Sequence, residues 1–95
     1  MGISGRGISN LPFLEGSVTW DAASIGDGNE EAKEITITGA SLGDFVEVSL
    51  SIDVEDLGLT ADVTAANTVT CLLWNNTGGA INLGSATAYA RVFPR

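Results

Sequence analysis

Carboxylates are the main side chains of this chain that could do chemistry. It carries twelve Asp and Glu residues against four Lys and Arg, with no histidine and one cysteine, Cys71. The lack of histidine excludes Ser-His-Asp and Cys-His catalysis as well as His-ligated metal sites. Cys71 stands in the apolar run VTCLLW, where a buried free thiol is the usual case. We therefore predict a protein without catalytic residues.

Two groups of carboxylates could still form a site. A glycosidase needs two carboxyl groups across a cleft, and the stretch 53–62 holds Asp53, Glu55, Asp56 and Asp62. The loop 27–31, DGNEE, offers oxygen ligands for Ca²⁺, although its spacing matches no EF-hand. Both groups fall in loops or on the wet face of a strand pattern. We interpret them as solvated surface and predict no cofactor, while calcium binding at 27–31 stays open.

The net charge of −8 is unevenly distributed along the chain. Every acid lies between Glu15 and Asp62, and residues 63–95 carry only Arg91 and Arg95. Phosphates require Lys and Arg, so we exclude nucleic acid as a partner. No glycine-rich phosphate-binding motif is present, and no apolar run is long enough to cross a bilayer. The acidity either keeps a small domain soluble or steers it toward a basic partner.

The longest regular element is predicted at residues 45–55, FVEVSLSIDVE. Apolar residues from Val46 to Val54 alternate with polar or acidic residues from Glu47 to Glu55. Successive side chains of a strand point to opposite faces, so this pattern predicts a strand with one dry and one wet face. Such a strand requires a second sheet or a partner chain to cover its dry face.

Shorter strand patterns recur along the rest of the chain, at intervals of about 8–12 residues with glycine-rich turns between them. The sequence AANT at 65–68 favours a hairpin between two of them. We predict one all-β domain over residues 17–95, a small antiparallel β-sandwich of jelly-roll or Ig-like type. Further strands are expected at 17–20, 34–38, 59–64, 69–75 and 86–93.

Residues 1–16 are predicted to form an extended N-terminal arm. The glycines at positions 2, 5 and 7 oppose both helix and strand in isolation. A purely disordered tail, however, rarely carries this many large apolar residues. The arm therefore either lies against a neighbouring chain or packs along its own domain. The partner-binding residues expected in it are Ile3, Arg6, Ile8, Leu11 and Phe13.

Two strand patterns place large residues on the face that should be wet. Leu72 and Trp74 share one face of the first, and Tyr89, Arg91 and Phe93 share one face of the second. Trp, Tyr and Arg are enriched where protein surfaces meet, so we predict that these five residues bind a partner. The alternative is that both strands are buried on both faces inside the domain.

Residues 18–92 resemble a small β-sandwich module of tailed-bacteriophage virion proteins. The segments that carry the resemblance are TGASLGDFV (38–46), AANTVT (65–70) and NNTGGAINL (75–83), and the arm lies outside it. The resemblance implies a homo-oligomer, commonly a trimer, that docks on a larger viral assembly and has no catalytic residues. Such modules occur as capsid-decorating proteins and as parts of tail fibres.

From this resemblance we expect a capsid decoration (cement) protein, made in the host cytoplasm and located on the outer capsid surface of the virion. As a homotrimer it would bind the major capsid protein and stabilise the assembled shell by mass action. The alternative is a tail-fibre or spike module that binds a host-surface glycan, with Trp20 and Asp21 as the candidate residues. A high copy number in the virion would favour the first function.

Overall fold

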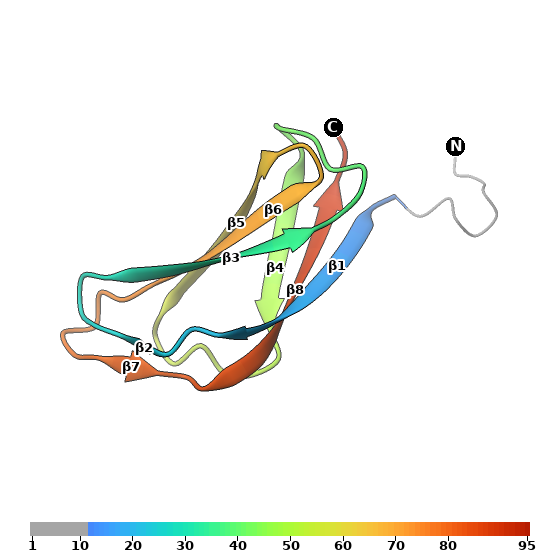
Figure 1. Cartoon of the computed structure of the whole chain (residues 1–95). Helices are drawn as coiled ribbons and strands as arrows, with labels where there is room; N and C mark the ends of the chain where they lie inside the picture. Colours follow the sequence, from blue (N-terminus) through green and yellow to red (C-terminus); the bar gives the residue numbers. More distant parts are fainter. Residues whose placement is uncertain (1–11) are drawn as a thin grey trace.

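The computed structural model describes residues 12–95, which form two antiparallel sheets packed face to face (Figure 1). One sheet has the strand order β1-β8-β4 and the other β3-β6-β5, while a short β2-β7 pair lies at one end. The prediction of an all-β fold, a small antiparallel β-sandwich, is confirmed. The strands are β1 (Leu14–Asp21), β2 (Ser24–Ile25), β3 (Glu30–Thr36), β4 (Phe45–Leu50), β5 (Gly58–Ala65), β6 (Thr68–Trp74), β7 (Ile81–Asn82) and β8 (Ser85–Phe93).

Three of the strand pairs are nested around the middle of the chain. β1 pairs with β8, β2 with β7 and β3 with β6, while β4 and β5 lie side by side in different sheets. Because β4 pairs with β8 and β5 with β6, the pairing gives two sheets that enclose one core. It also places β8 in the middle of one sheet, between β1 and β4, so that residues far apart in the sequence share a face.

Small side chains allow the two sheets to approach closely. Ala86, Ala88 and Ala90 form the inward side of β8 and are buried. Gly16 of β1 lies opposite Ala90 of β8, and a β-carbon at Gly16 would stand 2.7 Å from Cγ1 of Ile37. Ile35 of β3 and Ile37, which follows it, fill the space beneath Gly16. The sheet that approaches the alanine face thus belongs to the same chain.

The predicted long strand at 45–55 is shorter in the structure, because β4 ends at Leu50. Its alternation holds up to that point, with Val46 and Val48 packed against the core. Beyond it the chain bends, and Glu55 takes a positive φ of 59° while its N–H donates to Oδ1 of Asp53 at 2.9 Å. The period-two pattern therefore continues past the end of the strand, into a turn.

Other element boundaries also differ from the sequence prediction. β1 begins at Leu14 rather than at residue 17, so the last three residues of the predicted arm belong to the sheet. β3 starts at Glu30, within the stretch expected to be a loop. The hairpin at 65–68 is confirmed: it joins β5 to β6, and Asn67 adopts the positive φ of 62° that the turn requires. Among residues 12–95 there is no helix long and apolar enough to cross a membrane.

Candidate functional site

Aromatic side chains gather on the outer side of the β1-β8-β4 sheet. Because the alanines of β8 point inward, Tyr89, Arg91 and Phe93 point outward, and Phe45 of β4 stands opposite Phe93 in the register. This outer side, together with Phe13 just before β1, is called the aromatic face below. It carries all three phenylalanines of the chain and its only tyrosine.

One end of the aromatic face is a cluster of rings with a cation. The ring centroids of Phe13 and Phe93 are 5.8 Å apart with the planes tilted by 54°, and Cζ of Arg91 lies 4.7 Å from the centroid of Phe13. The Arg91 Nε donates to Oε1 of Glu15 at 2.9 Å. Ring edges and cations pack favourably in such arrangements. The contacts fix the guanidinium over the end of the sheet.

Two further apolar side chains near this end project into solvent. Phe45 is 68% exposed, and Leu42, in the loop before β4, is 70% exposed. The C-terminal residue lies beside this loop, since the N–H of Arg95 donates to Oδ1 of Asp44 at 3.2 Å. The group Phe13, Leu42, Phe45 and Phe93 is called the aromatic end below. Exposed large apolar side chains gathered at one place mark docking surfaces.

An open groove runs along the same face and continues onto β5 of the other sheet. Its lining comes from β1, β8, β4 and β5. Glu15 and Glu47 flank Arg91 in the register, Ser17 and Ser49 flank Tyr89, and β5 contributes Asp62 and its neighbours. Tyr89 is 49% exposed, so its ring is accessible from the groove. This set, called the carboxylate groove below, can form hydrogen bonds and ion pairs and offers one aromatic surface.

The five strand residues predicted to bind a partner do not form one surface. They lie on opposite sides of the molecule. Tyr89, Arg91 and Phe93 lie on the aromatic face, whereas Leu72 and Trp74 lie on the outer side of the β3-β6-β5 sheet. Trp74 stands opposite Gly58, where an added β-carbon would meet the indole at 2.0 Å. The indole therefore lies against its own sheet. The alternative that both strands are buried on both faces is wrong, because Tyr89 and Trp74 are exposed.

Of the predicted arm residues, only Phe13 falls within the described part of the chain. Ile3, Arg6, Ile8 and Leu11 lie outside the described residues. Phe13 contacts both Phe93 and Arg91, so residues expected in the arm and in the last strand come together. Nothing in the sequence links Phe13 to residues 80 positions later; only the β1-β8 pairing does so.

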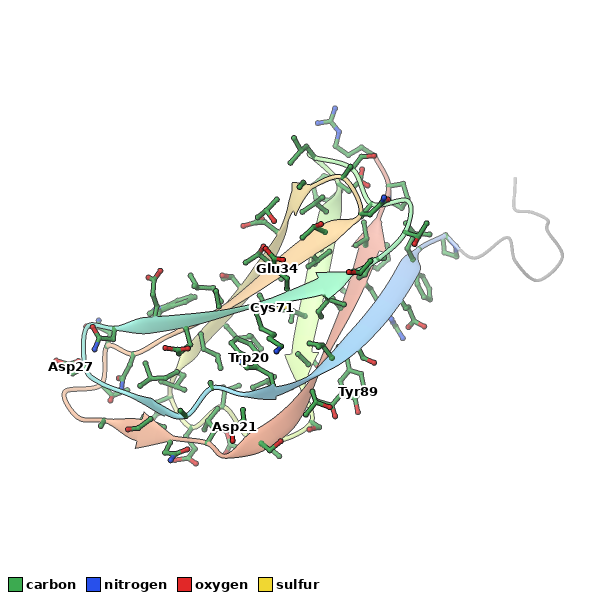
Figure 2. The ribbon with its side chains drawn as sticks, in the orientation of Figure 1. Trp20, Asp21, Asp27, Glu34, Cys71 and Tyr89 are labelled. Atoms are coloured by element: carbon green, nitrogen blue, oxygen red, sulfur yellow. The ribbon has the colours of Figure 1, made fainter. Side chains whose placement is uncertain are left out.

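The glycan-binding residues considered from the sequence do not form an exposed pair. Trp20 is 4% exposed and belongs to the core, so the prediction of an exposed aromatic groove at Trp20 and Asp21 is wrong. The Oδ1 of Asp21 accepts a hydrogen bond from the N–H of Ala23 at 3.1 Å. Figure 2 shows Trp20 and Cys71 inside the sandwich and Tyr89 outside it.

The loop at 27–31 is held by hydrogen bonds to the loop after β6. Oδ1 of Asp27 accepts from the N–H of Gly78 at 3.0 Å. Asn75 is buried, and its Nδ2 donates to the carbonyls of Ile25 and Gly79 at 2.7 and 2.8 Å. In the described part of the chain, no three His, Cys, Asp or Glu side chains are placed to hold a metal ion. The segment 75–79 thus holds the neighbouring loop in place through these hydrogen bonds.

Cys71 is completely buried between the sheets. Desolvation raises the pKa of its thiol to about 11, so the thiolate is suppressed at neutral pH. The sequence prediction of a buried free thiol is confirmed. Sequence reasoning assigns no partner to Phe45, Leu42 or Glu47, and it considers Asp62 only as a possible glycosidase carboxylate. Phe45 looked like the first residue of an ordinary two-faced strand.

No protein-family model fits the chain, and no curated protein sequence is significantly similar to it.

Proposed function

We propose that this chain is a non-enzymatic structural protein of a phage virion, a decoration protein that docks on the outer capsid surface as a homotrimer. The observation that carries the proposal is the aromatic end, where Phe45 and Leu42 stand in solvent beside the packed rings of Phe13 and Phe93. A chain of this size that needs no partner has little reason to expose these side chains. The resemblance of residues 18–92 to phage virion modules supplies the identity of the partner.

The aromatic end is suited to a docking role for a second reason. Arg91 is positioned by Glu15 and by the Phe13 ring, so the guanidinium loses little freedom when a partner binds. Aromatic residues and arginine supply most of the energy in protein interfaces. Binding of many copies to the assembled shell, and not to its separated subunits, would stabilise the shell by mass action.

The experiment is co-sedimentation of the purified protein with expanded capsid shells that lack it. The variant Phe45→Ser should bind about 30-fold more weakly, the loss expected when an interface anchor worth about 2 kcal/mol is removed. Because Phe45 is exposed, the same variant should keep the free energy of unfolding within about 0.5 kcal/mol.

The matched control is Thr36→Ser on the outer side of β3, which should bind shells like the unaltered protein. Full-strength shell binding by Phe45→Ser would reject the aromatic end as the docking site. Failure of the unaltered protein to bind shells at all would reject the decoration function itself.

A second candidate function, recognition of a host-surface glycan, has one observation in its favour. The carboxylate groove is lined by the exposed ring of Tyr89, the carboxylate of Glu47 and the hydroxyls of Ser17 and Ser49. A sugar can stack on such a ring while its hydroxyls bond to the polar groups. Loss of glycan binding by Tyr89→Ala, together with a low copy number in the virion, would favour this function over the first.

A further inference from the structure

The carboxylate groove has an excess of negative charge. Its charged lining residues are Glu15, Glu47, Asp62 and Arg91. The only ion pair within residues 12–95 joins Arg91 to Glu15, which leaves Glu47 and Asp62 without a cationic partner in the described part of the chain. The groove therefore favours an occupant that carries positive charge.

The groove also offers contacts to an apolar, extended occupant. Tyr89 exposes half of its surface there, and the half-buried Val48, Leu59 and Ala61 contribute to the lining. β4 and β5, which supply part of the lining, each form one of the two edges of their sheet. The backbone groups on the free side of an edge strand can pair with an added strand.

The chain contains a segment with the matching chemistry in residues 1–11. Arg6 is its only charged side chain, and Ile3, Ile8 and Leu11 are apolar. Eleven residues can span up to about 36 Å when extended, which exceeds the about 30 Å length of a nine-residue strand such as β8. The glycines at positions 5 and 7 permit close approach to another backbone.

The position of Pro12 favours a groove on another copy. β1 runs antiparallel to β8, and Phe13 precedes it at the end where the rings of Phe13 and Phe93 pack. Proline disfavours compact conformations of the residue before it, which opposes a tight reversal of the chain at that point.

We propose that residues 1–11 of one copy bind in the carboxylate groove of a second copy, with Arg6 near Glu47 and Asp62. The contact is heterologous, because the segment of each copy occupies the groove of the next. Such contacts close into a ring when the rotation between copies permits it, and a trimer is one such ring. The segment then joins copies to one another, a role separate from docking on a shell.

Cross-linking between two differently marked copies tests the placement of the segment. One copy carries Ile8→Cys and the other Ser49→Cys, on the groove lining. The native Cys71 stays in both, since it is buried and its thiol is unreactive. The expected result is a disulfide between the two chains under mild oxidation, at least tenfold faster than with the control copy Thr36→Cys, on the outer side of the other sheet.

Two outcomes of this experiment would overturn the proposal. Equal cross-linking to positions 49 and 36 would show that the segment has no preference for the groove. In a single chain that carries both Ile8→Cys and Ser49→Cys, a disulfide that forms only within the chain would show that the segment occupies its own groove.

Sedimentation equilibrium tests the charge pairing. Arg6→Glu and Glu47→Arg should each weaken self-association by about fivefold, the value of one partly exposed ion pair, and the double variant should recover it. Deletion of residues 1–11 should give a monomer with an unchanged circular dichroism spectrum. A deletion variant that still assembles, or a full chain that sediments as a monomer, contradicts the proposal.

Shell binding is measured separately, so the two proposals can fail independently. A monomeric deletion variant that still binds shells through the aromatic end would leave the decoration function in place. An oligomer that does not bind shells would reject the decoration function and would still support the groove contact between copies.

Discussion

The two outer faces of the sandwich are built from similar strands but carry different side chains. The outer side of β3-β6-β5 presents threonines and acids, such as the Thr64 and Thr70 pair, whose hydroxyl oxygens lie 2.6 Å apart. Its one large aromatic residue, Trp74, lies over Gly58 of the same sheet. On the aromatic face, Phe45 and Tyr89 project away from the sheet. A large side chain at an outward position can therefore either cover its own sheet or project into solvent. The residue opposite it in the register distinguishes these two cases.

The largest effect that would test this contrast comes from Gly58. Replacing it by alanine places a β-carbon 2.0 Å from Cε2 of Trp74 and forces the indole off the sheet. We expect a loss of about 1–3 kcal/mol in the free energy of unfolding, the usual cost of overpacking, measured by urea denaturation. The tryptophan fluorescence should shift to longer wavelength.

Gly79→Ala is the matched control, because nothing lies within 4 Å of a β-carbon at that position. Its free energy of unfolding should change by less than about 0.5 kcal/mol. If both variants lost the same stability, the indole of Trp74 would not be held by Gly58, and Trp74 would return as a candidate docking residue.

An intermediate effect is expected from Cys71, whose side chain points inward from the same strand that carries Trp74. Burial raises the pKa of this thiol from 9.0 to about 11, so the unfolded chain loses the proton at a lower pH than the folded one. The contribution of the thiol to stability is complete below pH 9 and is lost as the pH rises toward 11. Urea denaturation between these pH values should show the decline.

The variant Cys71→Ala lacks the titrating thiol and should show a shallower decline over the same range, although it starts from a lower stability because of the cavity. Equal slopes for the two proteins would mean that water reaches the interior of the β3-β6-β5 sheet. The contrast between a wet outer side and a dry inner side of that sheet would then be weaker than the structure indicates.

Much of the fold was predictable from local pattern. Alternation of apolar residues identified the last strand almost to its ends, and the hairpin at 65–68 followed from its turn residues. The end of β4 was not predictable, since Ile52 and Val54 keep the alternation through the bend that follows Leu50. Period-two patterns report which residues would share a face but not where the strand stops.

The candidate site was predictable only in part, because it depends on which strands are neighbours. Tyr89, Arg91 and Phe93 stood out as large residues at outward positions. Phe45 did not, since its role follows from the pairing of β4 with β8. The glycan-binding alternative requires an exposed Trp20, yet this residue is buried. A short run around a tryptophan does not reveal which face of its strand meets the core.

The smallest expected effect concerns the ion pair of Arg91 and Glu15 on the aromatic face. Both side chains are about half exposed, at 52% and 54%, and such pairs contribute about 0.2–1 kcal/mol. A double-mutant cycle with Arg91→Ala and Glu15→Gln should give a coupling energy in this range that falls in 1 M NaCl, as screening predicts. Glu34→Gln serves as the control, because Glu34 is exposed on β3 of the other sheet and forms no ion pair within residues 12–95.

The coupling energy also reports on the environment of the face in solution. In an isolated chain, water screens the pair, and salt should remove most of the coupling. A coupling well above 1 kcal/mol that resists salt would require the pair to be withdrawn from water, as happens beneath another chain. Measured at protein concentrations below and above self-association, the same cycle should therefore change from salt-sensitive to salt-resistant if a second copy covers this face. A coupling that is weak and salt-sensitive at both concentrations would mean that the ion pair stays exposed when copies associate.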